Sequence, residues 1–72
     1  MIDFAPIRHS ESRSVVDVWC DGDCVGSLVL FKGQWQTNEG LTKWLFLDEP
    51  LTDTSLLCLK TKIVEKLPGE TP

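Results

Sequence analysis

The sequence predicts an α+β fold, in which an antiparallel three- to four-stranded β-meander packs against one C-terminal α-helix. Three observations predict it: a turn signal between two apolar runs in residues 15–31, further strand-like runs up to residue 47, and helical spacing of apolar residues after residue 52. The 72 residues are enough for one domain at most. We divide it into an irregular N-terminal segment (1–14), the meander (15–47), the helix (53–67) and a tail (68–72).

The clearest local signal is a β-hairpin. Val15–Cys20 and Cys24–Phe31 are rich in β-branched and aromatic residues, which favour strands. Asp21-Gly22 lies between them, and Asp-Gly is a preferred hairpin turn because glycine adopts positive φ without steric cost. We therefore expect these two runs to pair in antiparallel fashion.

The register of this hairpin is left open by the sequence. A two-residue turn pairs Cys20 with Asp23, Trp19 with Cys24, and Asp17 with Gly26. A three-residue loop instead pairs Cys20 with Cys24 and moves the second strand's side chains to the other face. Gly26 inside a strand indicates a bulge or a close approach by a large group, for which Trp19 is the candidate.

Further strands are predicted on both sides of the hairpin. Trp35–Thr37 begins a third strand, and Leu41–Leu47 continues as a fourth after a turn at residues 38–40, unless the two are one long strand with a bulge. Ile2–Phe4 either forms a short edge strand or lies over the core. The polar run Arg8–Ser14 is typical of a loop.

The C-terminal part has the spacing of an amphipathic helix. Its apolar stripe consists of Leu56, Leu59, Ile63 and Leu67, widened by Leu57 and Val64. Thr52 and Asp53 are alternative N-cap residues, between which the sequence does not choose. Pro68-Gly69 is expected to end the helix.

The charge balance disfavours direct nucleic-acid binding. Eleven acidic and seven basic residues give a net charge of −4, and the basic residues are scattered instead of clustered. An acidic surface favours a basic protein or a ribonucleoprotein complex as the partner, and it also simply keeps a protein in solution. The chain begins without a signal-like segment and has no apolar run of bilayer length, so we expect a cytoplasmic protein without a membrane partner.

The candidate partner-binding residues are carboxylates and one tryptophan. The acids form two groups, one along the hairpin and one between the last predicted strand and the helix: Asp17, Asp21, Asp23, Asp48, Glu49 and Asp53. Asp is also common in turns and helix caps, so a purely structural role is the competing interpretation. Of the three tryptophans, Trp35 is the one expected to be exposed, because its neighbours are polar.

No pattern in the chain is typical of an enzyme or a metal site. Cys20, Cys24, Cys58 and His9 lack the regular paired spacing of structural zinc ligands, and a strained Cys20–Cys24 disulfide is a minor alternative. His9 is surrounded by Ser and Glu, but neighbours in a polar loop do not make a catalytic triad. We expect no catalytic residue, no metal and no cofactor.

The hairpin carries a resemblance to a class of proteins. Residues 16–35 follow the pattern V-x-V-W-x-D-G-x-x-V-G-S-L…G-x-W, which resembles the hairpin of many short phage and mobile-element proteins with a β-meander closed by a helix. This class includes anti-CRISPR inhibitors. The resemblance covers about a third of the chain, implies a fold more than an activity, and transfers no functional residue.

Three functions from different classes follow as expectations. The first is a small non-enzymatic phage or prophage inhibitor, acting in the host cytoplasm, that binds a basic nucleic-acid-handling defence complex, by DNA mimicry or otherwise. The second is a structural or adaptor module, monomeric or homodimeric. A metal-dependent or hydrolytic enzyme ranks third.

Overall fold

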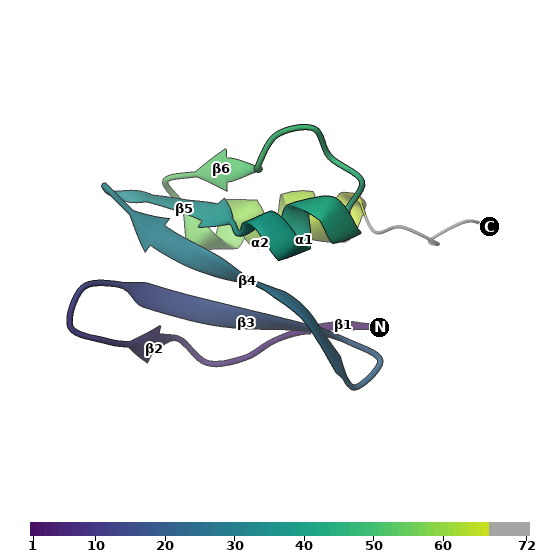
Figure 1. Ribbon diagram of the computed structural model, residues 1–72, viewed down its shortest axis with the longest axis horizontal. Helices are drawn as coiled ribbons and strands as arrows, with labels where there is room; N and C mark the ends of the chain where they lie inside the picture. Colours follow the sequence, from purple (N-terminus) through teal and green to yellow (C-terminus); the bar gives the residue numbers. More distant parts are fainter. Residues whose placement is uncertain (67–72) are drawn as a thin grey trace.

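The structure, a computed structural model, describes residues 1–66 and confirms the α+β class, with an antiparallel sheet and a C-terminal helix (Figure 1). The sheet has more strands than predicted. Its order is β1-β3-β4-β5-β6, with β2 also paired to β3. The elements are β1 (Ile2–Phe4), β2 (Arg8–His9), β3 (Ser14–Cys20), β4 (Asp23–Phe31), β5 (Gln34–Thr37), α1 (Glu39–Trp44), β6 (Thr52–Asp53) and α2 (Leu56–Glu65).

The β3–β4 hairpin has the two-residue turn. Asp21 and Gly22 both have positive φ, 50° and 88°, and the pairs Cys20–Asp23 and Trp19–Cys24 form as that register predicts. The register then shifts, so that Gly26 lies opposite Val18 and not opposite Asp17, which pairs with Ser27. The predicted Asp17–Gly26 pair is therefore wrong, because β4 contains one extra residue in a bulge.

Gly26 allows a helix, not Trp19, to approach the sheet. A β-carbon at Gly26 would lie 2.5 Å from Leu41 Cβ and 2.8 Å from Leu41 Cα. The close approach expected from the sequence is thus present, but the group that makes it is Leu41 of α1, through its β-carbon and its backbone.

The predicted fourth strand, Leu41–Leu47, is wrong: these residues form most of α1 and the loop that follows. Asn38, expected in a turn, is the N-cap and accepts a hydrogen bond from the Leu41 N–H at 2.8 Å. Leu41 and Leu45 are 0% and 4% exposed, which is the i, i+4 spacing of one buried helix face. Over so few residues the apolar run fits both the two-residue period of a strand and the 3.6-residue period of a helix. The Asn38 cap and the burial of Leu41 and Leu45 together select the helix.

The N-terminal segment is more regular than predicted. Ile2–Phe4 forms the edge strand β1, which was one of the two expected alternatives. Arg8 and His9 were expected in a loop, but they form β2 and pair with Val15 and Ser14. This small hairpin closes with a hydrogen bond from the Ser10 N–H to the Arg13 carbonyl at 2.9 Å.

The C-terminal helix begins later than predicted. Ser55 is its N-cap, and its hydroxyl accepts from the Cys58 N–H, whereas Thr52 and Asp53 pair with β5 as β6. Leu59 and Ile63 are fully buried, as the stripe predicts, but Leu57 and Val64 are exposed and do not widen it. Leu67 and the predicted tail at 68–72 lie outside the described residues.

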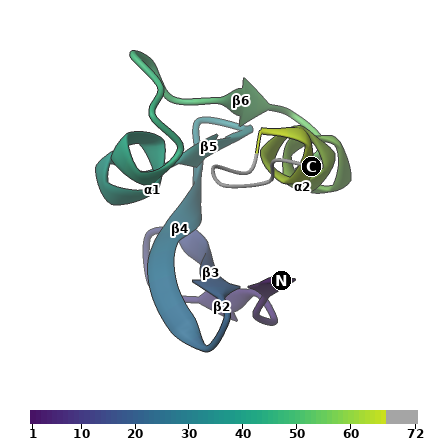
Figure 2. The ribbon, with the colours of Figure 1, turned by 90° about the vertical axis from the view of Figure 1, so that its right-hand side faces the viewer.

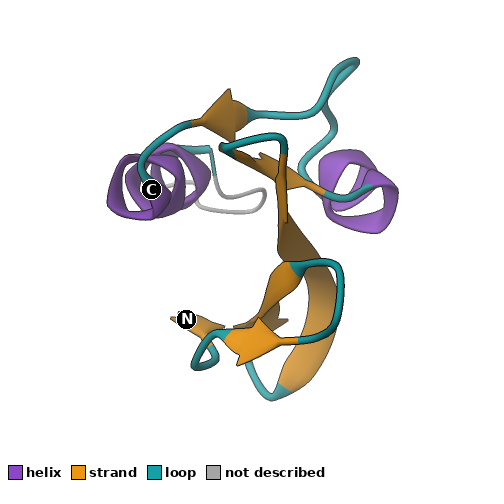
Figure 3. Cartoon of the chain, turned by 90° about the vertical axis from the view of Figure 1, so that its left-hand side faces the viewer, coloured by secondary structure: helices purple, strands orange, loops and turns teal. Residues whose placement is uncertain are grey.

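One apolar cluster joins the sheet to both helices. Its buried members are Val16, Val18, Leu28, Trp35, Leu41, Leu45, Leu59 and Ile63. Viewed along the long axis, β5 lies between α1 on one side and α2 on the other (Figures 2 and 3). Lys60 of α2 places its Nζ 5.3 Å from the Phe4 ring centroid, so α2 reaches from β6 to β1. Within residues 1–66, no helix has the length and apolarity needed to cross a membrane.

Candidate protein interaction surface

Two acidic loops stand out among the predicted site residues. The β3–β4 turn carries Asp21 and Asp23, and the α1–β6 loop (residues 45–51) carries Asp48 and Glu49. Figure 1 places both loops on its right-hand side, one at the bottom and one at the top, and both face the viewer in Figure 2. The structure thus brings them to one end of the molecule, at opposite corners of it.

The β3–β4 turn has one engaged and one open carboxylate. The Met1 ammonium lies 2.6 Å from Asp21 Oδ1 and donates a hydrogen bond to it. That hydrogen bond, with the positive charge behind it, lowers the pKa of Asp21 below its ordinary value. Asp23 is exposed and has no ion pair within residues 1–66.

Asp17 and Asp53 are engaged in the fold. Asp17 accepts from Arg8 Nη2 at 2.9 Å, across from β2 to β3. Asp53 accepts from the Ser55 N–H at 2.8 Å and pairs with Lys62 Nζ at 3.0 Å. The Ser55 hydrogen bond is the main cause of a lowered Asp53 pKa, and Lys62 adds to it. These two carboxylates therefore have intramolecular roles that the sequence pattern did not reveal.

The α1–β6 loop is fixed at both ends. Leu45 at its start is buried and donates its N–H to the Leu41 carbonyl at 2.9 Å. Leu51 at its end exchanges hydrogen bonds with Thr37, donating to Thr37 Oγ1 at 3.1 Å and accepting from the Thr37 N–H at 3.0 Å. Asp48 and Glu49 lie between these anchors, exposed and without an ion pair in the described part of the chain. The loop therefore exposes two carboxylates while hydrogen bonds fix both of its ends.

A hollow borders this loop. It has a volume of about 350 Å³ and lies between β5, α1 and the loop, with Thr37, Thr42, Leu47 and Asp48 among its lining residues. The buried Thr37 and Thr42 hydroxyls are 2.7 Å apart and satisfy each other. No buried polar side-chain atom among the described residues lacks a partner, so no unpartnered buried group in this hollow points to a ligand.

The expected exposure of Trp35 is wrong. Trp35 is 8% exposed, because β5 lies between β4 and β6 and its ring joins the core on the same face as Leu30. The polar Gln34 and Gln36 alternate with it and take the other face. Trp19 is the exposed tryptophan, at 38%, where β3 ends beside the turn.

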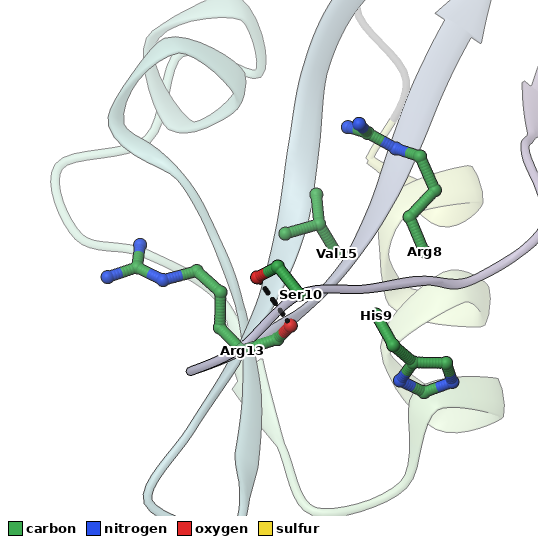
Figure 4. Close-up of a pocket in the computed structure, with 5 residues that line it drawn as sticks. All are labelled: Arg8, His9, Ser10, Arg13 and Val15. Atoms are coloured by element: carbon green, nitrogen blue, oxygen red, sulfur yellow. Dashed lines mark hydrogen bonds between the residues drawn. The ribbon is translucent and has the colours of Figure 1, made fainter.

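A basic region occupies the opposite end. Arg8, His9, Ser10, Arg13 and Val15 line a hollow of about 510 Å³ beside the β2–β3 turn. Figure 4 shows the two guanidinium groups lying apart and not converging on one point, while Ser10 Oγ donates to the Arg13 carbonyl. Because the two guanidinium groups do not converge, Arg8 and Arg13 do not form a two-cation clamp for an anion in this hollow.

His9 forms a hydrogen bond, but not a triad. Its Nδ1 lies 2.8 Å from Ser14 Oγ, and both groups are exposed on the β2–β3 hairpin. No carboxylate is hydrogen-bonded to His9 within residues 1–66, so no orienting acid is in place there. Cys20, Cys24 and Cys58 are free thiols, and no group of three potential metal ligands occurs in the described chain.

Phe46 was not identified from the sequence as a functional residue. It is 83% exposed and lies between α1 and the two loop carboxylates. In the sequence it belongs to the apolar run Leu41–Leu47, which pattern reading assigned to a strand. Only when α1 is known to end at Trp44 does Phe46 stand out as an exposed residue of the loop that follows.

No protein-family description, curated protein sequence or solved structure matches the chain. The resemblance to short phage proteins therefore stays a prediction that rests on the hairpin residues alone.

Proposed function

We propose that this protein is a small non-enzymatic inhibitor, of the kind that phages and prophages encode, which binds a basic nucleic-acid-handling complex in the host cytoplasm. The observation that carries the proposal is the pair of acidic loops, in which Asp23, Asp48 and Glu49 are exposed without an intramolecular ion pair in residues 1–66. Such carboxylates attract the lysines and arginines with which these complexes hold nucleic acid.

Charge supports a protein partner over a nucleic acid. The net charge is −4, and the basic side chains Arg8 and Lys62 are already paired with Asp17 and Asp53. Phosphate backbones would be repelled by both acidic loops. A cation-lined channel is the surface that complements them, and occupying it blocks nucleic acid without any chemical step.

The test uses purified CRISPR effector complexes, each presented to the immobilised protein. At least one complex is expected to bind at about 0.05 M salt and to elute as salt approaches about 0.5 M, because screening weakens exposed charge pairs. Binding should also slow when competing DNA occupies the complex. Failure of every complex to bind at low salt contradicts the proposal.

Three charge reversals locate the surface. Glu49→Lys in the α1–β6 loop should reduce affinity about tenfold or more, since a like-charge contact replaces an attractive one. Glu11→Lys makes the same chemical change in the exposed Ser10–Arg13 turn and should leave affinity unchanged. Asp23→Lys tests the second loop in the same way. If Glu49→Lys and Glu11→Lys lost equal affinity, the loss would come from the change in net charge and not from a contact made by the α1–β6 loop.

The alternative function is a self-associating structural or adaptor module. The exposed Leu57 (74%) and Val64 (45%) favour it, because they lie seven residues apart on one face of α2. Light scattering across a concentration series distinguishes the two functions. A stable dimer that Leu57→Lys converts to a monomer would favour the module.

A further inference from the structure

Phe46 combines an exposed aromatic ring with an unfavourable backbone conformation. It is 83% exposed and has φ of 59°, in the left-handed region. For a residue with a β-carbon this region is costly, and bulky side chains rarely adopt it. Within residues 1–66 two other non-glycine residues share it, Asp21 and Lys32, but each is followed by a glycine and opens a two-residue hairpin turn that requires positive φ.

The hydrogen bonds at the end of α1 show why the backbone turns there. The Phe46 N–H donates to the Lys43 carbonyl at 3.0 Å, and the Leu47 N–H donates to the Thr42 carbonyl at 3.1 Å. This is the Schellman arrangement, and Phe46 occupies the position that glycine usually takes. The motif explains the conformation but not the phenylalanine, since glycine or asparagine would form the same bonds with less strain.

Packing does not explain the phenylalanine either. The neighbours Leu45 and Leu47 contribute to the apolar cluster, whereas Phe46 is left in solvent. The other strongly exposed phenylalanine, Phe31, differs in this respect, because Lys32 Nζ lies 5.3 Å from its ring centroid. A strained backbone that displays a bare aromatic ring points to a role outside the fold.

We propose that Phe46 is the apolar anchor of the binding surface and that it enters an apolar pocket on the partner protein. Asp48 and Glu49 then meet lysine or arginine side chains at the rim of that pocket. This inference rests on the proposed function and adds to it which residue supplies the central contact and what the partner must offer.

The chemistry of the loop selects this occupant. Aromatic anchors surrounded by polar residues are the usual centre of protein interfaces. A membrane surface with anionic headgroups would repel Asp48 and Glu49, and so would the phosphates of a nucleic acid. An apolar pocket with a cationic rim complements both parts of the loop.

The loop also holds Phe46 in place before binding. Leu45 is buried, Leu47 is tied to Thr42, and Leu51 is tied to Thr37. Little additional ordering is therefore needed when the ring enters a pocket, and a small entropy cost favours affinity.

The experiment compares Phe46→Gly with Phe31→Thr, using the CRISPR effector complex that binds the unmodified protein. Phe46→Gly should lose about 30-fold or more in affinity, as truncation of an interface hot spot does. Its thermal midpoint should be unchanged or up to about 4 °C higher, because glycine relieves the left-handed strain. Phe31→Thr removes the exposed ring at the end of β4 and should retain full affinity.

The outcomes separate this inference from the function on which it rests. If the unmodified protein binds and Phe46→Gly binds equally well, the anchor is refuted and the proposed function stands. A lower thermal midpoint for Phe46→Gly would also refute it, because the ring would then be part of the fold. If no complex binds the unmodified protein, both proposals fail.

Discussion

The two ends of α1 differ in whether contacts inside the molecule explain their residues. At the N-terminal end Asn38 caps the helix, Thr42 bonds to Thr37, and Leu41 lies against Gly26. At the C-terminal end the chain leaves the core at Leu45, displays Phe46, and continues into Asp48. Every side chain at the first end has a partner inside the molecule. At the N-terminal end the tightly fixed residue, Leu41, is buried. At the C-terminal end the residue with the constrained backbone, Phe46, is exposed.

The largest expected effect tests the first end. Gly26→Ala introduces a β-carbon within 3 Å of Leu41 backbone atoms, so α1 must move away from β4. We expect a loss of about 3 kcal/mol in the free energy of unfolding, at the upper end for overpacking. Urea denaturation measures it. Gly40→Ala is the control, since its β-carbon would meet nothing closer than 3.7 Å and alanine favours the helix by about 0.5–1 kcal/mol. A neutral Gly26→Ala would show that the contact is not tight.

A medium effect is expected at the helix cap. Asn38→Ala removes the acceptor for the Leu41 N–H and the donor to Ser27 Oγ, both at 2.8 Å. The expected loss is about 1–2 kcal/mol, the size of a strong N-cap. Asn38→Asp keeps the acceptor for the Leu41 N–H and replaces the amide donor to Ser27 by a carboxylate oxygen, which can only accept from the Ser27 hydroxyl, so it should cost less in the same denaturation series. If Asn38→Asp cost as much as Asn38→Ala, the Ser27 bond would be the dominant one.

The smallest effect concerns the anchoring of β6 to α2. Asp53 has a lowered pKa in the folded protein, so its ionised form stabilises the fold. This stabilisation is fully present above the ordinary value of 3.8 and disappears as the pH falls towards the lowered pKa. Asp53→Asn should lower the thermal midpoint slightly at pH 7, and the difference from the unmodified protein should shrink below pH 4. A difference that grew in acid would contradict the sign of the pKa change.

The sequence predicted the regions in which local chemistry decides the structure. Asp21-Gly22 specified its turn, and the spacing of Leu59 and Ile63 specified the buried face of α2. It failed where tertiary contacts decide. Leu41–Leu47 suited a strand equally well, and the helix is selected by the Asn38 cap together with the burial of Leu41 against Gly26.

The same limit applies to the candidate surface. Asp23, Asp48 and Glu49 were identified from composition and loop position, and all three are exposed. Pattern alone could not separate them from Asp17 and Asp53, whose partners Arg8 and Lys62 are nine residues away in sequence. Trp35 was misjudged because polar neighbours on an alternating strand indicate the opposite face, not exposure.

The most direct test of the account is the affinity of Phe46→Gly for a CRISPR effector complex that binds the unmodified protein, measured beside its thermal midpoint. The account predicts that affinity falls about 30-fold or more while the midpoint holds or rises by up to about 4 °C. Full affinity, or a loss of affinity that accompanies a fall in the midpoint, would contradict the claim that the C-terminal end of α1 is built for a partner.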